Sequence, residues 1–297
     1  MMKDECPLVS VVIPVFNGEQ YIASTIQSVL DQAYEHVEIV VVDDCSEDRS
    51  FKAASEAMED LDVSVVKKLD VNSGVCIARN HAIELASGQF IVPLDADDVL
   101  HPSFIQKGID VFRKRGSEVD VVYSKTQFMG ARCDEFVLPD YCPNIMRRRN
   151  LVPVTGMFRK SDWQRYGGYN ENMKYGLEDW DFWLNFVEDE KTFHRIPEKL
   201  FFYRQHERKQ GSRNADLAEN ARRLTLMHVQ IKRNHPKLYN SEPNPVLLGK
   251  HRIYSILNYL TLGLHPKIRQ KHDRYSIEAE YELSLEARPK FFSRKSY

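Results

Sequence analysis

The sequence has few cysteines, and their arrangement argues against a disulfide framework and against a zinc site. Five cysteines occur among 297 residues, at irregular spacing and with no CxxC pair. An odd number in such an arrangement favours neither a disulfide framework nor a zinc site. The five positions are Cys6, Cys45, Cys76, Cys133 and Cys142.

Long hydrophobic runs are also lacking. No uninterrupted apolar stretch approaches the roughly 20 residues that a helix needs to cross a bilayer. The first five residues, Met1–Glu5, are polar and lead straight into a strand-like stretch, without a secretory signal pattern. We therefore expect a cytoplasmic protein, kept in a reducing environment.

The chain has no large excess of either charge, but its charges are unevenly distributed. The net charge is -2, which gives no general bias toward nucleic acid, and we expect no nucleic-acid partner. Residues 207–297 hold 18 Lys and Arg against 9 Asp and Glu, whereas residues 1–206 hold 23 against 34. This asymmetry predicts an acidic domain over 1–206 and a basic extension over 207–297.

Short β-branched runs alternate with amphipathic stretches up to about residue 95. Alternation of this kind predicts an α/β fold, with a Rossmann-like, mostly parallel central sheet flanked by helices and joined by right-handed crossovers. Gly88 fits the C-cap of the third helix. The predicted strands are 8–16, 37–42, 63–66 and 89–94, and the predicted helices are 19–32, 47–58 and 75–86.

The alternation loosens after Asp98. The pattern there predicts helices over 102–114 and 180–187, and strands over 119–124, 126–129, 134–138, 155–159 and 199–204. From about Gly211 onward the pattern is helical, so the basic extension is expected to be helical too.

Acidic residues follow two of the predicted parallel strands. The second strand ends in Asp43-Asp44 and the fourth in Asp95-Ala96-Asp97-Asp98. If the strand order is 3-2-1-4, both ends face one crevice, together with the turn Pro14–Gly18 after the first strand. So many carboxylates in one place favour a hard divalent cation. Each cluster alone is also explained by helix caps or turns, and that interpretation stays open at this point.

A second acidic group begins a predicted helix much later in the chain. Glu178-Asp179 lies at the start of an apolar helical stretch. Acids in a first turn are favoured by the helix dipole, so an ordinary helix start explains them. The functional interpretation is a general base near the metal.

With these pieces in this order, the chain resembles glycosyltransferase family 2, the inverting enzymes with a GT-A fold, of the bacterial surface-polysaccharide type. The resemblance covers roughly residues 8–206, about two-thirds of the chain. It implies a nucleotide-binding half over 1–100 and an acceptor-binding half over 101–206. The motifs are SVVIPVFNGEQYI (10–22), SVLDQAYEHVEIVVVDDCSED (28–48), NSGVCIARNHAIELASGQFIVPLDADDVLHP (72–102) and GLEDWDFWLNF (176–186).

The resemblance implies a set of donor contacts and metal ligands. Asp44 would accept a hydrogen bond from a uracil ring, and Arg204 and His206 would reach the diphosphate. A surface position is the alternative for Arg79. Whether Asp97 or Asp98 is the main ligand of a Mn²⁺ or Mg²⁺ ion stays open, with Asp97 favoured. The implied donor-binding residues are Pro14, Phe16, Asn17, Glu19, Asp44, Arg79, Asp95, Asp97 and Arg204, and the implied metal ligands are Asp97, Asp98 and His206.

The implied reaction is a single displacement at the anomeric carbon of a nucleotide diphosphate sugar, with a UDP-sugar favoured. Asp179 would be the catalytic base, and Glu178 would position the base or the acceptor. The expected acceptor is a glycan or a lipid-linked oligosaccharide, reached from the inner face of the cell membrane.

Three other interpretations of the function of these residues remain. PLDADDV also fits the nucleophile motif of haloacid-dehalogenase-type phosphohydrolases, but the paired acids Asp43-Asp44 lie upstream of it instead of downstream. Response-regulator receiver domains begin with the VVVDD strand, whereas a complete βα unit comes first here. A non-catalytic sugar-nucleotide-binding or assembly protein on the same scaffold is the third alternative.

The basic extension carries one apolar helical face. Its residues Ile253, Ile256, Leu257, Leu260 and Leu264 fall at helical spacing, with basic residues nearby. Packing against the catalytic domain is one interpretation of this face, and peripheral contact with an anionic membrane is the other.

Overall fold

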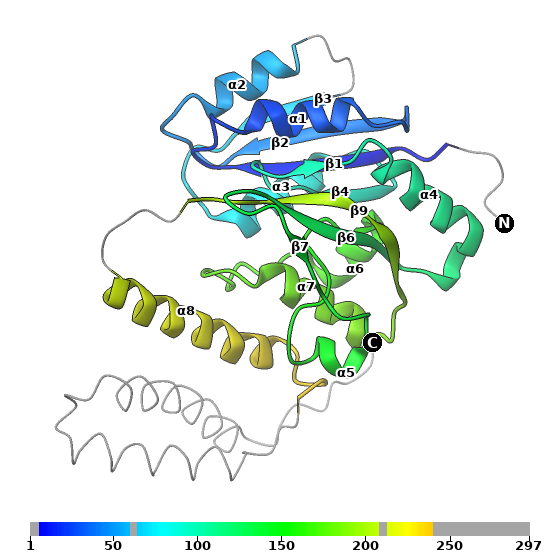
Figure 1. Ribbon diagram of the computed structural model, residues 1–297, viewed down its shortest axis with the longest axis vertical. Helices are drawn as coiled ribbons and strands as arrows, with labels where there is room; N and C mark the ends of the chain where they lie inside the picture. The colour runs from blue at the N-terminus through cyan, green and yellow to red at the C-terminus, as the bar shows by residue number, and fades with distance from the viewer. Residues whose placement is uncertain (1–5, 60–63, 208–212, 240–297) are drawn as a thin grey trace, which may run out of the picture. The chain divides into compact units, whose positions relative to one another are not determined.

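The computed structural model describes residues 6–59, 64–207 and 213–239 (Figure 1). The chain divides into two compact units, Met1–Lys174 with Glu178–Lys209, and Tyr175–Leu177 with Gln210–Tyr297. Of the second unit, helix α8 (Arg213–Asn234) forms most of the described part. The apolar face predicted at Ile253–Leu264 lies outside the described residues.

The first half of unit 1 is a four-stranded parallel sheet in the order β3-β2-β1-β4, which is the order that brings the predicted strand ends to one crevice. Helix α3 contacts β1 and β2, whereas α1 contacts α2 (Figure 1). Right-handed crossovers in this strand order place α3 on the opposite face from α1 and α2. The strands are β1 (Val9–Val15), β2 (Val37–Asp43), β3 (Ser64–Lys68) and β4 (Phe90–Pro93), and the helices are α1 (Ile22–Leu30), α2 (Ser50–Ala57) and α3 (Val75–Leu85).

The second half of unit 1 extends the same sheet with mixed pairing. The order continues β4-β8-β6-β9-β5, in which only β6 and β9 are parallel, and β7 pairs with β6. The strands are β5 (Val99–Leu100), β6 (Val121–Gly130), β7 (Glu135–Phe136), β8 (Met157–Arg159) and β9 (Phe193–Gln205). The helices are α4 (Phe104–Arg115), the 3-10 turn η1 (Gly116–Glu118), α5 (Pro143–Met146), α6 (Lys160–Tyr166) and α7 (Glu178–Glu188).

Two strands are longer than the sequence predicts. β6 is one strand where two short ones were expected, because its register against β9 shifts between Ser124 and Thr126 and breaks the alternation of buried side chains. β9 begins at Phe193 instead of residue 199, since its exposed middle, which includes Pro197, has the pattern of a loop.

The core explains why the first strand is apolar throughout. Every residue of β1 is buried, as expected for a parallel strand covered on both faces. Around α7 the core is aromatic: the Phe158 ring centroid lies 5.2 Å from that of Phe182 and 5.7 Å from that of Trp183. These contacts fix α7 against β8, and with it the acidic first turn of the helix.

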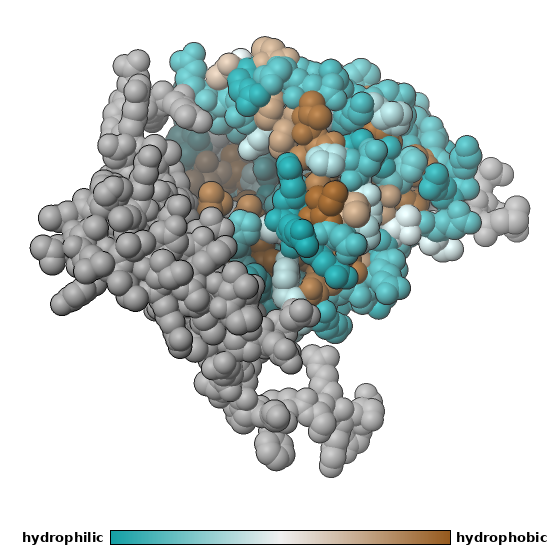
Figure 2. Space-filling view, turned by 60° about the horizontal axis from the view of Figure 1, so that its bottom comes forward, coloured by the Kyte–Doolittle hydropathy of each residue, from teal (hydrophilic) through white to brown (hydrophobic). Residues whose placement is uncertain are grey.

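Within the described residues, no helix combines the length and the apolarity needed to cross a bilayer. On the face drawn in Figure 2, hydrophobic side chains lie in separate patches between hydrophilic ones. Exposed apolar side chains such as Phe16, Val71 and Val137 come from different loops of the fold.

Gly88 does not cap α3, contrary to the sequence prediction. The helix ends at Leu85, and its C-cap residue Ala86 has extended backbone. A Cβ atom on Gly88 would lie 2.4 Å from Ser10 Oγ and 2.7 Å from Ser10 N. The Gly88 N–H donates to Ser10 Oγ, which in turn donates to the buried carboxylate of Glu38. Glycine is therefore needed for close packing against β1.

We expect Gly88→Ala to destabilise the fold by about 1–3 kcal/mol, because the added methyl overpacks the junction with β1. Urea denaturation measures the change in the free energy of unfolding. Ser87→Ala is the matched control, since Ser87 is exposed and uses only its backbone N–H here, toward Glu38. It should change stability by less than about 0.5 kcal/mol. Equal stability of Gly88→Ala and wild type would show that the junction is looser than the structure indicates.

Candidate functional site

The predicted strand ends meet at one edge of the sheet. The Asp44 N–H donates to the Val15 carbonyl at 2.8 Å, and the Leu94 N–H donates to the Val12 carbonyl at 3.0 Å. The ends of β1, β2 and β4 are therefore neighbours. Their acidic and polar residues form the rim of the carboxyl edge, where ligands of such sheets bind.

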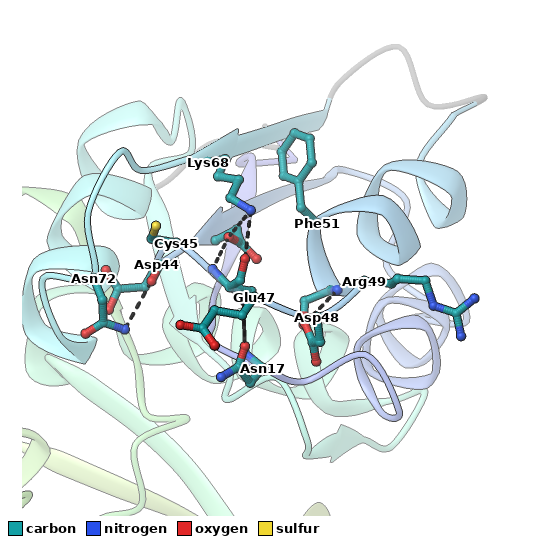
Figure 3. Close-up of polar contacts among 12 residues, drawn as sticks. Asn17, Asp44, Cys45, Glu47, Asp48, Arg49, Phe51, Lys68 and Asn72 are labelled. Carbon is teal, nitrogen blue, oxygen red and sulfur yellow. Dashed lines mark hydrogen bonds and ion pairs between the residues drawn. The ribbon is translucent and has the colours of Figure 1, made fainter.

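Asp44 connects β2 to the start of α3. Its buried carboxylate accepts hydrogen bonds from the N–H of Ser73 at 2.7 Å and of Gly74 at 2.8 Å. Its carbonyl accepts one from Asn72 Nδ2 (Figure 3). The sequence left open that Asp44 caps the helix directly after it; the structure directs the carboxylate to α3 instead. Each oxygen keeps a second lone pair for a ligand donor.

The turn after β1 is fastened to the turn after β2. Asn17 donates through its N–H to Ser46 Oγ and accepts at Oδ1 from the Glu47 N–H, both at 2.9 Å (Figure 3). Glu19 accepts from the Arg49 N–H at 2.9 Å. These bonds fix the turn after β1, which begins with the half-exposed Phe16, to the turn after β2.

Three residues at the ends of β1 and β2 also bear on the predicted donor contacts. Pro14 is buried inside β1, so it shapes the strand end without facing outward. Asn17 and Cys45 both have left-handed backbone, with φ of 51° and 62°. Non-glycine residues in this region of backbone space are often found at functional turns.

Arg79 is the central cation of the site. Its side chain is fully buried, which rules out the surface position considered from the sequence. Nη2 lies 2.8 Å from Asp95 Oδ1, and Nη1 lies 3.0 Å from Glu178 Oε1. The guanidinium carbon lies 4.9 Å from the Tyr169 ring centroid. Burial lowers the pKa of Arg79, but the carboxylates of Asp95 and Glu178 outweigh it, so the pKa rises and the cation is retained.

Asp98 faces inward, toward β9. Its carboxylate is fully buried and accepts a hydrogen bond from the Arg204 N–H at 2.7 Å, while its other oxygen has no hydrogen-bond partner in the structure. Burial and the nearby Asp95 charge raise the pKa of Asp98 to about 9. Thr25 secures the same loop by donating to the carbonyl oxygens of Ala96 and Asp98.

Asp97 faces His206. The distance from Asp97 Oδ2 to His206 Nε2 is 2.6 Å, and both side chains are partly exposed, by 31% and 50%. Arg204 Nε donates to the Asp97 carbonyl at 2.7 Å. Within residues 6–59, 64–207 and 213–239, no three His, Cys, Asp or Glu side chains form a group that could hold a metal ion. Asp97 and His206 thus lie together, whereas Asp98 points away from them.

Tyr21 belongs to this group, although it falls within the helix that the sequence predicts over 19–32. It precedes α1, with its ring 4.6 Å from the Arg204 guanidinium carbon and 5.3 Å from the His206 ring. The Tyr21 ring therefore contacts both Arg204, near the end of β9, and His206, which follows β9, beside Asp97. In the sequence, Tyr21 is marked by its place near the end of the family motif at residues 10–22.

Asp179 lies in the first turn of α7 with both oxygens engaged. Oδ2 accepts from Asn150 Nδ2 at 2.8 Å, and Oδ1 accepts from the Trp180 N–H at 2.7 Å. Burial and the adjacent Glu178 charge raise the pKa of Asp179 to about 7. The sequence gave no sign of Asn150, which lies in an irregular segment after α5.

Comparisons with known proteins indicate the family that the chain resembles and the fold that it shares. Residues 10–148 match the family model of glycosyl transferase family 2. TuaG of Bacillus subtilis, named as a teichuronic acid biosynthesis glycosyltransferase, is 36% identical over 133 residues, which are 44% of this chain and 52% of that protein. The chain thus spans about half the length of this relative.

Two solved structures share the fold. TarS of S. aureus, residues 1–349 with UDP-GlcNAc, superposes with a TM-score of 0.60 at 16% identity, covering 94% of this chain and 90% of that one. The mannosyltransferase PcManGT from Pyrobaculum calidifontis, with GDP-Man and Mn²⁺, gives 0.58 at 17% identity, covering 95% and 88%. The fold is therefore the GT-A fold that the resemblance implied.

The Arg79 bridge generates a stability prediction. Arg79→Ala leaves Asp95 and Glu178 close together without their shared cation, and should lower the free energy of unfolding by about 3–5 kcal/mol. Chemical denaturation measures this loss. Arg165→Ala is the control, because that exposed arginine pairs with Asp189 at the surface and should cost under about 1 kcal/mol. Similar losses in the two variants would contradict a buried, shared cation.

Proposed function

Because the chain belongs to glycosyl transferase family 2, we propose that it transfers a sugar from a nucleotide diphosphate donor to a hydroxyl of a glycan or lipid-linked oligosaccharide. The observation that carries the proposal is that one buried arginine, Arg79, binds both the first acid of the Asp95–Asp98 motif and Glu178. The acids that would meet the donor and those that would meet the acceptor thus share one centre.

A UDP-sugar is the favoured donor. Among the structural neighbours, TarS was solved with UDP and with UDP-GlcNAc, and PcManGT with GDP-Man. In this chain Phe16, Asn17 and Asp44 offer a half-exposed aromatic ring with side-chain amide and carboxylate oxygens on the neighbouring turns, which suits a flat base with N–H donors. The predicted contacts of Glu19 with the ribose and of Arg204 with the diphosphate are part of this proposal.

Asp97 and His206 would hold a divalent ion, Mn²⁺ or Mg²⁺. They face each other and are partly exposed, so both can turn toward a ligand, and such ions are often held by one or two protein groups plus substrate phosphates. Asp98 does not fit this role as well, since its carboxylate is buried against the Arg204 N–H. When bound, the ion would offset negative charge on the departing diphosphate.

Asp179 is the proposed base. Its carboxylate would take the proton of the acceptor hydroxyl as that oxygen attacks the anomeric carbon from the face opposite the nucleotide, which inverts the configuration. Asn150 and the Trp180 N–H orient its two oxygens. Glu178 stays beside Arg79 and positions the base. We place the reaction in the cytoplasm, at the inner face of the cell membrane.

We predict that Asp179→Asn loses about 10²–10⁴-fold in turnover while binding donor almost normally, because the amide cannot accept the proton. UDP release from a panel of nucleotide sugars, with and without oligosaccharide acceptors, measures turnover, and calorimetry measures donor binding. Asp110→Asn, a change at an exposed carboxylate on α4, is the control and should keep full activity. Wild-type turnover in Asp179→Asn would remove Asp179 as the base.

A second prediction concerns pH. Since burial and Glu178 raise the pKa of Asp179 to about 7, and only its ionised form accepts a proton, turnover should rise as pH increases through about 7 and level off above it. Rates at saturating donor over about pH 5.5–8.5 give the profile, with donor affinity measured at each pH to separate binding from turnover. A flat or falling profile would contradict the assignment.

A further inference from the structure

Three consecutive arginines, Arg147–Arg149, follow α5 and form what we call the arginine segment. All three are exposed, whereas Met146, directly before them, and Leu151, two positions after them, are buried. The arginine segment is therefore a short exposed loop between two buried residues, and it carries three positive charges. Their run of charge is unusual in a domain that carries 34 Asp and Glu against 23 Lys and Arg over residues 1–206.

The arginine segment is fixed at both ends to the first turn of α7. Before it, the Met146 carbonyl accepts a hydrogen bond from Trp180 Nε1 at 2.7 Å. After it, Asn150 Nδ2 donates to Asp179 Oδ2 at 2.8 Å. The two anchors are consecutive residues of α7, so the segment is a short loop closed beside the proposed base.

Two charges of this loop, those of Arg148 and Arg149, are not paired within the described part of the fold. Their guanidinium groups make no hydrogen bond or ion pair with the described residues. The nearest acid before them, Asp140, is already paired with Arg195. The backbone N–H groups of Arg148 and Arg149 both bond the Ile145 carbonyl, so a tight turn holds the two side chains close together. Unpaired arginines in a fixed turn are suited to bidentate recognition of carboxylate or phosphate.

We propose that the arginine segment binds an anionic group of the acceptor, so that the acceptor is a glycan carrying phosphodiesters or carboxylates. This inference rests on the proposed function, because it takes Asp179 as the group that receives the acceptor hydroxyl. The hydroxyl would attack beside Asp179 while a negative group of the same or the next repeat lies on the arginines. The segment thereby sets which acceptors align with the base.

Binding of labelled oligomers to the full chain tests the proposal. The probes are a glycerol phosphate oligomer, an oligogalacturonate and an uncharged maltooligosaccharide of equal length. We expect one or both anionic probes to bind more tightly than the neutral one, and the better probe identifies phosphate or carboxylate as the preferred group. Arg148→Gln with Arg149→Gln should weaken anionic binding about tenfold, since two exposed charge contacts are lost.

The matched control is Lys114→Gln with Arg115→Gln. These residues are also consecutive, basic and exposed, in the last turn of α4, and their replacement removes the same charge. It should leave anionic binding at the wild-type level. Equal binding of the neutral and anionic probes, or equal losses in the two double variants, would overturn the proposal.

Two further measurements separate this inference from related ones. UDP titration of each variant should match wild type; absence of UDP binding by wild type would defeat the proposed function, while arginine-dependent capture of the anionic probes would still support an anion site. Sedimentation with phosphatidylglycerol vesicles is the second. Arginine-dependent binding to vesicles but not to the oligomers would overturn the proposal and assign the segment to a lipid surface.

Discussion

The contact on which the site depends is the double ion pair of Arg79 with Asp95 and Glu178. The two carboxylates come from segments far apart in the chain, one after β4 and one at the start of α7, 83 positions later in the sequence. Without a cation between them, they would repel each other in a poorly solvated place. With the cation, the loop after β4 and the first turn of α7 are fixed relative to each other.

The same contact distributes charge among the remaining acids. Glu178 is compensated by Arg79, but its charge still acts on the neighbouring Asp179, which has only neutral donors, Asn150 and a backbone N–H. Burial and the adjacent Glu178 charge raise the pKa of Asp179, whereas Asp97 remains partly exposed beside His206. The acids of the site thus have different environments: Asp95 is bridged by Arg79, Asp98 is buried against the Arg204 N–H, Asp97 faces a histidine, and Asp179 accepts from neutral donors. Different environments allow similar groups to take different roles.

The sequence predicted what depends on local pattern. The buried runs and the helices between them predicted the parallel strands β1–β4, and the order β3-β2-β1-β4 seen in the structure brings Asp44 and Asp95–Asp98 to one edge. It did not predict contacts that depend on distant partners. Nothing in the helix around Arg79 shows that its partner is Glu178, 99 positions away. Asn150 lies in an irregular segment, where no periodicity marks a side chain that reaches Asp179. Tyr21 lies at the N-terminal end of α1, inside the predicted helix 19–32, and an apolar helix pattern does not show whether such a residue packs in the core or contacts a site.

We propose that the carboxyl edge of the sheet binds a nucleotide diphosphate through an ion held at Asp97 and His206. Calorimetric titration of UDP, with and without Mn²⁺, tests it most directly when wild type is compared with Asp97→Ala. We expect Mn²⁺ to increase the affinity of wild type for UDP, and we expect this increase in affinity to be lost in Asp97→Ala. Absence of UDP binding by wild type, or the same gain from Mn²⁺ in both proteins, would contradict it.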